Sequence, residues 1–369
     1  MTEPLLFTPV RLGPLHLANR IAVSPMCQYS AVEGSASDWH LMHLGQFATG
    51  GAGLIIVEAT GVLPEGRISP ACLGLWSDAN EAALKPALAF VRRHSAARIA
   101  IQLGHAGRKG SGNLPWRGGG PIMPDAPGGW RTVAPSPLPF DSGWPAPMAL
   151  DQAGLERVKD GFARATRRAL RLGFDAIELH GAHGYLIHQF LSPLSNRRDD
   201  AYGGSLDNRL RFPLELFDAV RALWPANRAL GIRVSASDWV DGGWELEQTI
   251  QFAMALKARG CDFIDVSSGG SSPAQQIPLG PGYQVPFAEA VRRETGLATL
   301  AVGMITGAQQ AEDILQAGQA DMVCLARALL WDPHWPWHAA AELGATAPFP
   351  PQYARAHPSL KGPPTPADY

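Results

Sequence analysis

Short aliphatic runs alternate along the chain with longer segments whose apolar residues follow a helical spacing. The short runs are almost continuously apolar, which is typical of parallel strands that are buried on both faces. This pattern predicts eight strands, at Ile21–Val23, Leu54–Val57, Ile99–Leu103, Ala176–Leu179, Leu230–Val234, Phe263–Val266, Thr299–Val302 and Met322–Leu325.

The clearest helix prediction covers the segment after Asp151. From Leu155 to Leu172 the apolar residues recur at steps of three and four, which places them on one face of a helix. Asp151 is a suitable N-cap, and Gly173 stands where a glycine commonly ends a helix. Similar patterns predict helices over Leu210–Trp224, from Leu246 until Gly260 ends it, and over Ala308–Ala317.

Eight strands with intervening helices in one chain of 369 residues predict an α/β protein, a (β/α)8 TIM barrel. A doubly wound sheet is the alternative, but no GxGxxG sequence follows the first strand. We expect a single barrel domain over residues 1–345. Residues 113–147, after the third strand, contain nine prolines and predict a long loop excursion that caps the barrel mouth. The proline-rich tail, residues 346–369, is expected to wrap the surface or reach a neighbouring subunit.

The composition narrows the possible functions. Lysine plus arginine number 31 and aspartate plus glutamate 33, so the net charge of −2 gives no electrostatic footprint for nucleic acid or an anionic membrane. No apolar run approaches the roughly 20 residues of a membrane span, and the N-terminal segment lacks the features of a signal peptide. The four cysteines are widely spaced without a CxxC motif, which favours reduced thiols in the cytoplasm over a zinc or iron–sulfur site.

Polar residues follow the predicted strands, where the catalytic groups of TIM barrels lie. An arginine that ends an apolar strand, such as Arg233, needs an anion or a π-acceptor. Gly303 and Arg327 follow the seventh and eighth strands, the usual phosphate position of these barrels. There a glycine lets backbone N–H groups approach a phosphate, and an arginine can bind it bidentately. Together these residues predict a phosphate-bearing cofactor across the mouth.

Three interpretations apply to His180 and His183, which follow the fourth strand. They could share a metal ion with a third ligand such as Glu178 or Asp200, or be loop histidines that bond to the backbone. The favoured interpretation is that they donate hydrogen bonds to a substrate carbonyl or anion, with no metal. Cys27, in the loop after the first strand, could simply fill space, because free cysteines are often buried.

Several longer stretches between residues 7 and 342 are much more specific. Among them are Pro25-Met26-Cys27-Gln28-Tyr29, Gln102-Leu103-Gly104-His105, His180-Gly181-Ala182-His183-Gly184-Tyr185 and Tyr202-Gly203-Gly204-Ser205. With these motifs the chain resembles the old yellow enzyme family, in the subgroup called thermophilic-like ene-reductases.

The resemblance implies non-covalently bound FMN, which NADPH or NADH reduces and whose N5 then gives hydride to the β-carbon of an activated alkene. Enones, enals, maleimides and nitro compounds are the expected substrates. In this reading Gln102 would hydrogen-bond the pyrimidine ring, and Arg233 would face N1 and O2. The full set of residues that would bind the cofactor is Ser24, Pro25, Met26, Cys27, Ala59, Gln102, Arg233, Ala301, Val302, Gly303, Ala326 and Arg327.

The resemblance also implies a substrate site. Hydride addition to an enone builds charge on its carbonyl oxygen, which His180 and His183 can stabilise as hydrogen-bond donors. Tyr185 resembles the family's proton donor to the α-carbon, and Tyr29 would be a second phenol at the substrate. Arg355 lies in a segment similar to one that enters the neighbouring subunit's site, so we expect a homodimer or a larger homo-oligomer. The alternatives are a non-catalytic flavin-binding sensor and an iron–sulfur-free dienoyl-CoA or enoate reductase.

Overall fold

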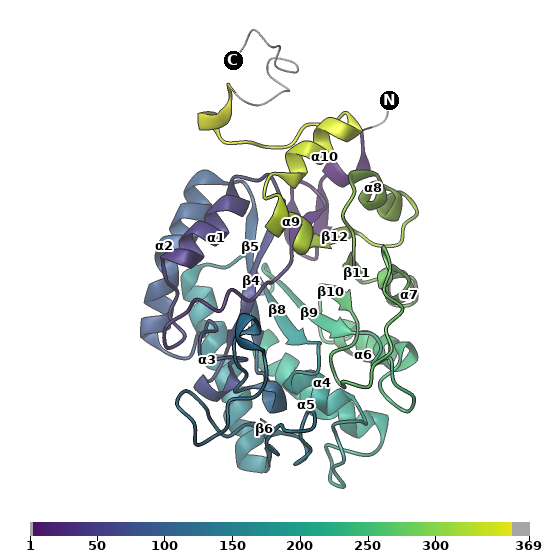
Figure 1. The fold of residues 1–369 in the computed structure, drawn as a ribbon. Helices are drawn as coiled ribbons and strands as arrows, with labels where there is room; N and C mark the ends of the chain where they lie inside the picture. The colour runs from purple at the N-terminus through teal and green to yellow at the C-terminus, as the bar shows by residue number, and fades with distance from the viewer. Residues whose placement is uncertain (1–2, 356–369) are drawn as a thin grey trace.

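The computed structural model describes residues 3–355 and has a closed barrel of eight parallel strands at its centre (Figure 1). All eight predicted strands are confirmed, and the predicted TIM barrel with them. Around the barrel the strands follow the order β3 (Ile21–Val23), β4 (Leu54–Gly61), β5 (Arg98–Gly104), β8 (Ala176–Gly181), β9 (Ala229–Ser235), β10 (Phe263–Ser267), β11 (Ala298–Ala301) and β12 (Met322–Leu325).

The strand β4 continues past its predicted end at Val57 as far as Gly61. The sequence pattern ends at the charged Glu58, yet this side chain is buried because it pairs with His40, with Nε2 and Oε1 3.3 Å apart. The pairing with β5 shifts register between Val57 and Thr60, so the strand is irregular around Ala59.

Helices cover the outside of the barrel, and the predicted helix after Asp151 is confirmed as α3 (Gln152–Leu172). The Asp151 carboxylate accepts a hydrogen bond from the Gly154 N–H at 2.8 Å, and Gly173 ends the helix with φ +77°. The remaining helices are α1 (Asp38–Ala48), α2 (Asp78–His94), α4 (Leu186–Leu191), α5 (Leu206–Arg221), α6 (Leu246–Lys257), α7 (Val285–Thr295), α8 (Ala308–Gln316), α9 (Arg327–Trp331) and α10 (Trp335–Leu343). Within residues 3–355, no helix combines the length and apolarity that crossing a membrane requires.

The inside of the barrel is apolar at the end where the strands begin. A hairpin of β1 (Val10–Leu12) and β2 (Leu15–Leu17) packs its leucines against the first residues of the strands. The hairpin was not predicted, because its strands Val-Arg-Leu and Leu-His-Leu each carry a polar central residue and lack the continuous apolar run used to predict strands. It closes the N-terminal end of the barrel, and the polar interior residues lie toward the other end.

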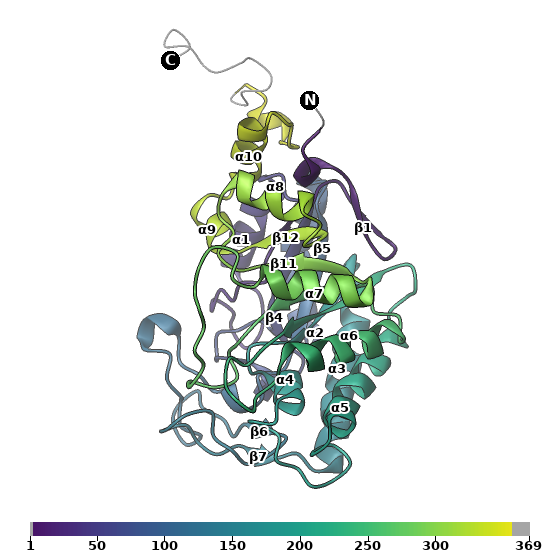
Figure 2. The ribbon, with the colours of Figure 1, turned by 90° about the vertical axis from the view of Figure 1, so that its right-hand side faces the viewer.

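The excursion after β5 is confirmed, and it includes the short strand β6 (Val133–Ala134), which pairs with β7 (Met148–Ala149). Figures 1 and 2 place β6 at the end of the molecule opposite to both termini. The excursion is therefore well separated from the C-terminal tail.

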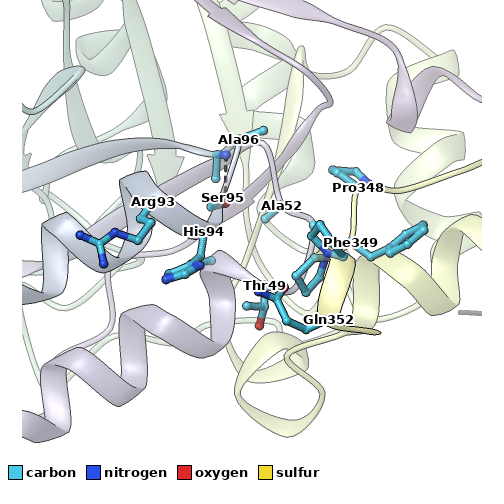
Figure 3. Close-up of a pocket in the computed structure, with 14 residues that line it drawn as sticks. Thr49, Ala52, Arg93, His94, Ser95, Ala96, Pro348, Phe349 and Gln352 are labelled. Carbon is cyan, nitrogen blue, oxygen red and sulfur yellow. Dashed lines mark hydrogen bonds between the residues drawn. The ribbon is translucent and has the colours of Figure 1, made fainter. Parts of the chain in front are cut away.

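The tail leaves α10 and is described as far as Arg355; residues 356–369 of the predicted tail lie outside the described part. The indole N–H of Trp337 donates to the Pro348 carbonyl at 3.0 Å. Between the tail and the ends of α1 and α2 lies a pocket of about 430 Å³ (Figure 3). Figure 3 shows Phe349 and Gln352 on one side of it and Arg93 on the other. This pocket is lined by no residue of the predicted site.

Candidate active site

Four polar side chains from neighbouring strands form the polar floor, the group Gln102, Glu178, Arg233 and Asp265. The Gln102 side-chain amide donates to Glu178 Oε1 at 2.7 Å, and Arg233 Nε lies 3.3 Å from Asp265 Oδ2. Strand register sets these pairs, since Gln102 stands opposite Glu178 and Arg233 opposite Asp265. All four side chains are buried.

The charges of the polar floor follow from this burial. Burial raises the pKa of Glu178 to about 8, the neighbouring Asp265 adds to this, and Arg233 opposes it. Burial alone would lower the pKa of Arg233, but Asp265 and other acidic neighbours outweigh it and raise that pKa. At neutral pH Glu178 is therefore largely protonated and Arg233 is cationic. Among the described residues, Glu178 Oε2 and Asp265 Oδ1 have no hydrogen-bond partner.

A cavity of about 420 Å³ opens beside the polar floor, over the ends of β10, β11 and β12. Gly303 lies in it with φ +124°, and a Cβ there would stand 2.8 Å from the Gln284 amide nitrogen. Only glycine therefore allows this backbone path. The lining residues are Arg233, Ser267, Pro281, Tyr283, Gln284, Val302, Gly303, Met304, Ile305, Thr306, Cys324, Ala326, Arg327 and Ala328.

Four of the five residues predicted at the phosphate end line this cavity. Ala301 does not, because its side chain is fully buried in β11. Tyr283 and Gln284 were not predicted, although Gln284 supports the loop by donating to the Val302 carbonyl at 3.0 Å. They stand well after β10 in the sequence, beyond the strand-end residues that the barrel rule selects.

The loop after β3 carries the predicted Ser24, Pro25, Met26 and Cys27. Ser24 Oγ lies 3.1 Å from the Cys324 sulfur, which fastens the start of the loop to β12. The Gln28 N–H donates to Glu58 Oε2 at 3.0 Å, which fastens its middle to β4. The buried contact between His40 and Glu58 thus holds the loop beside Ala59.

His180, His183 and Tyr185 form the substrate wall, a name kept for these three side chains. The ring of His180 lies 5.2 Å from that of His183 and 4.8 Å from that of Tyr185. His183 has φ +59°, and the Ser235 hydroxyl accepts from its N–H at 2.9 Å. Gly184 follows with φ +71°, and a Cβ there would stand 2.2 Å from the Gly270 carbonyl oxygen. This sharp turn brings the three rings together.

Burial sets the protonation of the substrate wall. It lowers the pKa values of His180 and His183 well below the usual value, and the positive charge of Arg233 adds to the effect. It raises the pKa of Tyr185 well above its usual value. Two neutral imidazoles therefore stand beside a protonated phenol. His180 Nδ1 is buried and has no partner among residues 3–355, so it can hydrogen-bond to a ligand.

The geometry does not favour the metal interpretation of the two histidines. Asp200, one proposed third ligand, pairs with Arg198, and the other, Glu178, bonds to Gln102. In the part of the chain that the structure describes, no three side chains of the metal-binding types gather around one point.

The segment after β5, from Lys109 through the excursion, adds residues that the sequence did not single out. The Trp116 ring packs edge-on against Tyr29, with centroids 5.7 Å apart. The Lys109 ammonium donates to the His183 carbonyl at 2.8 Å and lies 4.5 Å from the Phe140 ring and 5.2 Å from the Tyr185 ring. Burial lowers the pKa of Lys109 to about 7. Lys109 comes after the predicted strand-end residues Gln102 and His105 in the sequence, but its contacts span distant segments and leave no local pattern.

Arg355 is exposed and lies at the end of the described tail. Figures 1 and 2 place the tail at the opposite end of the molecule from α4, which begins directly after Tyr185. Within one protomer the structure does not bring Arg355 to the substrate wall.

Residues 5–345 match the family described as NADH:flavin oxidoreductase / NADH oxidase. The chain is 46% identical over 353 residues to an NADPH dehydrogenase of Geobacillus thermodenitrificans (strain NG80-2), covering 95% of this chain and 98% of that protein. It is 47% identical over 355 residues to an NADPH dehydrogenase of Geobacillus sp. (strain WCH70), covering 96% and 98%. Among solved structures, morphinone reductase is similar with a TM-score of 0.77 and 30% identity, covering 100% of this chain and 93% of that one.

Proposed function

Because the chain belongs to the NADH:flavin oxidoreductase / NADH oxidase family, we propose that it is an ene-reductase that acts on activated alkenes. It is an oxidoreductase of the old yellow enzyme type, with FMN as cofactor and NAD(P)H as reductant. The proposed substrates are enones, enals, maleimides and nitro compounds, each an alkene conjugated to a group that accepts negative charge.

The residues present fit FMN. The cavity of about 420 Å³ offers Arg327 and the glycine backbone of Gly303 to a phosphate. The polar floor offers the cationic Arg233, the Gln102 amide and the unpartnered Glu178 Oε2 to a polar ring. When bound, FMN supplies a hydride to the alkene.

The remaining proposed contacts to FMN come from three short segments. Ser24 to Cys27 and Ala59 would lie along the ring system. Val302, Gly303, Ala326 and Arg327 would hold the phosphate end, and Ala301 would contribute only through its backbone, since its side chain is buried in β11.

The substrate wall supplies the groups that the alkene needs. A carbonyl or nitro oxygen would accept hydrogen bonds from the neutral imidazoles of His180 and His183. Because these donors are already oriented, each is expected to stabilise the developing negative charge by about 3 kcal/mol. Tyr185, a protonated phenol, would deliver its hydroxyl proton to the α-carbon. The single observation that carries the proposal is this phenol 4.8 Å from an imidazole with an unpartnered buried nitrogen.

Tyr29 and Arg355 complete the proposed substrate site. The edge-on contact with Trp116 orients Tyr29 at the entrance. Arg355 would act in a second copy of the chain, because its own tail leaves from the far end of the molecule. The proposed enzyme is therefore at least a homodimer. Replacing Arg355 with alanine should weaken alkene binding and leave reduction by NADPH unchanged.

The test separates the two halves of the reaction. Purified protein should be yellow, lose its visible absorption with NADPH in the absence of air, and regain it when cyclohexenone is added. Analysis of the organic products should then show cyclohexanone in an amount equal to the NADPH consumed. Protein that bleaches but is reoxidised by none of the four substrate classes would refute the ene-reductase proposal and favour a flavin-binding sensor.

A further inference from the structure

The peptide plane between His183 and Gly184 is held at both of its polar atoms by side chains. Its carbonyl, from His183, accepts from the Lys109 ammonium at 2.8 Å, and its N–H, from Gly184, donates to His188 Nδ1 at 2.9 Å. His183 has φ +59°, a conformation that costs a non-glycine residue free energy unless its surroundings hold it. The two hydrogen bonds therefore fix the turn from which Tyr185 follows.

His188 lies in α4, the helix that begins directly after Tyr185, and its side chain is fully buried. Because the Gly184 N–H donates to Nδ1, that nitrogen acts as an acceptor, and the neutral ring carries its proton on Nε2. His188 Nε2 lies 2.9 Å from Asp238 Oδ1. His188 thus links the turn of the substrate wall to the segment after β9.

Asp238 fixes the outer side of the His188 ring and is itself fully buried. Its Oδ2 accepts from the Ser192 hydroxyl at 2.5 Å and from the Trp244 N–H at 2.9 Å. Burial alone would raise the pKa of Asp238, but His188 and these hydrogen bonds outweigh it and lower that pKa. Ser192 ends α4 and Trp244 precedes α6, so a charged carboxylate joins His188 to two elements of the barrel.

We propose that His188, kept in its tautomer and orientation by Asp238, is a positioning residue for the proton transfer from Tyr185. The inference rests on the proposed function, in which the phenol O–H bond breaks as a C–H bond forms at the α-carbon, and solvent water later returns the proton to the phenolate. Because it is fully buried, His188 acts through the Gly184 peptide and not by contact with the alkene. A displacement of about 1 Å at the reacting atoms can slow such a step by about 10²-fold.

Two substitutions at one position separate the two contacts of the imidazole. In His188→Asn the side-chain carbonyl takes the place of Nδ1 and can still accept from the Gly184 N–H. In His188→Gln the longer side chain carries its amide toward Asp238 and leaves the Gly184 N–H without that acceptor.

Stopped-flow absorbance of the FMN-loaded variants measures the consequence. We expect reoxidation by cyclohexenone to slow by about 10²-fold in His188→Gln and by less than about fivefold in His188→Asn. Reduction by NADPH should stay within about twofold in both, because the polar floor is untouched. Equal rates of reoxidation in the two variants would overturn the proposal.

A double variant shows whether His188 acts through Tyr185. In Tyr185→Phe protein no hydroxyl remains to be positioned, so adding His188→Gln should slow reoxidation by less than about threefold further. Damage to the structure alone would slow reoxidation by the same factor with and without the hydroxyl. That result would contradict the role of His188 in positioning.

Hydrogen exchange measures the hold on the turn without any alkene. In FMN-loaded protein the Gly184 amide should exchange at least about tenfold faster in His188→Gln than in His188→Asn or the unmodified chain, because only the first variant lacks the acceptor. Mass spectrometry with fragmentation to single residues resolves this amide. Exchange at one rate in all three proteins would show that His188 does not hold the turn.

The outcomes distinguish this inference from the proposed function. Unmodified protein that reduces no alkene would overturn both, whereas unmodified protein and His188→Gln that reduce cyclohexenone equally fast would overturn the inference alone. If His188→Gln fails to fold, Ser192→Ala removes the hydroxyl that donates to Asp238 and should slow reoxidation by about threefold to tenfold. An unchanged rate in that variant would also count against the inference.

Discussion

The polar floor and the substrate wall lie next to each other but are built in different ways. The polar floor stands on regular strands, where register alone pairs Gln102 with Glu178 and Arg233 with Asp265. The substrate wall depends on a turn in which His183 and Gly184 both have positive φ, and on Lys109, which follows β5 and donates to the His183 carbonyl. A strand framework suits a cofactor that is the same in every turnover, whereas loops can change with the substrate.

The largest expected effect distinguishes the substrate wall from the polar floor, because the two regions are expected to act in different steps of the reaction. Replacing Tyr185 with phenylalanine removes only the hydroxyl, so reoxidation of the protein by cyclohexenone should slow by about 10²–10⁴-fold. Reduction by NADPH should stay within twofold, since the polar floor is untouched. Stopped-flow absorbance measures both steps. A variant that slows both steps equally would show that Tyr185 supports the cofactor and not the alkene.

A substitution in the polar floor should lower the free energy of unfolding more than any single substitution in the substrate wall. In Arg233→Ala the buried Asp265 loses its ion-pair partner, so the free energy of unfolding should fall by about 3–5 kcal/mol. Retention of FMN should fall as well. Urea unfolding and gel filtration with absorbance detection measure the two effects. Arg233→Lys, which keeps the charge, is the matched control and should recover part of both.

Glu178 of the polar floor and Lys109, which contacts the substrate wall, should also give opposite dependences of stability on pH. The pKa of Glu178 is raised from 4.5 to about 8, so the folded state holds the extra proton and stability falls as the pH rises through that interval. The pKa of Lys109 is lowered from 10.5 to about 7, so the unfolded state holds the extra proton and stability rises over that interval.

Free energies of unfolding measured from pH 5 to 10, for the unmodified protein and for two variants, check the direction of each pH dependence. Glu178→Gln should remove the falling contribution and keep the hydrogen bond to Gln102. Lys109→Met should remove the rising contribution. If either variant leaves the pH profile of the unmodified protein unchanged, its residue does not titrate as the burial implies.

The smallest expected effect concerns the contact between Trp116 and Tyr29, which lies outside the three residues of the substrate wall. Trp116→Ala removes the edge-on contact with Tyr29, which is worth about 0.5–1.5 kcal/mol for an aromatic pair. We expect the KM for a bulky enone to change up to about tenfold, with kcat and the rate of flavin reduction nearly constant. Trp116→Phe should stay close to the unmodified protein. A change in the rate of flavin reduction would instead link Trp116 to the polar floor.

The difference between residues on regular strands and residues on loops also explains which parts of the site could be predicted from the sequence. The strands follow from continuous apolar runs, and the barrel rule then located Gln102, Arg233 and His180 at strand ends. Lys109 and Trp116 depend on contacts between distant segments, and no local pattern records such contacts. Ala301 was predicted from the family resemblance, but its side chain is fully buried in the hydrophobic core at the end of β11.

The hairpin β1–β2 has a kinetic consequence. Because its leucines seal the barrel at the end where the strands begin, ligands can reach the polar floor only from the other end. In the proposed ene-reductase the nicotinamide and the alkene would then enter through the same opening, and we expect the first product to depart before the second reactant enters. Reciprocal plots of rate against one reactant, taken at several concentrations of the other, should accordingly be parallel lines.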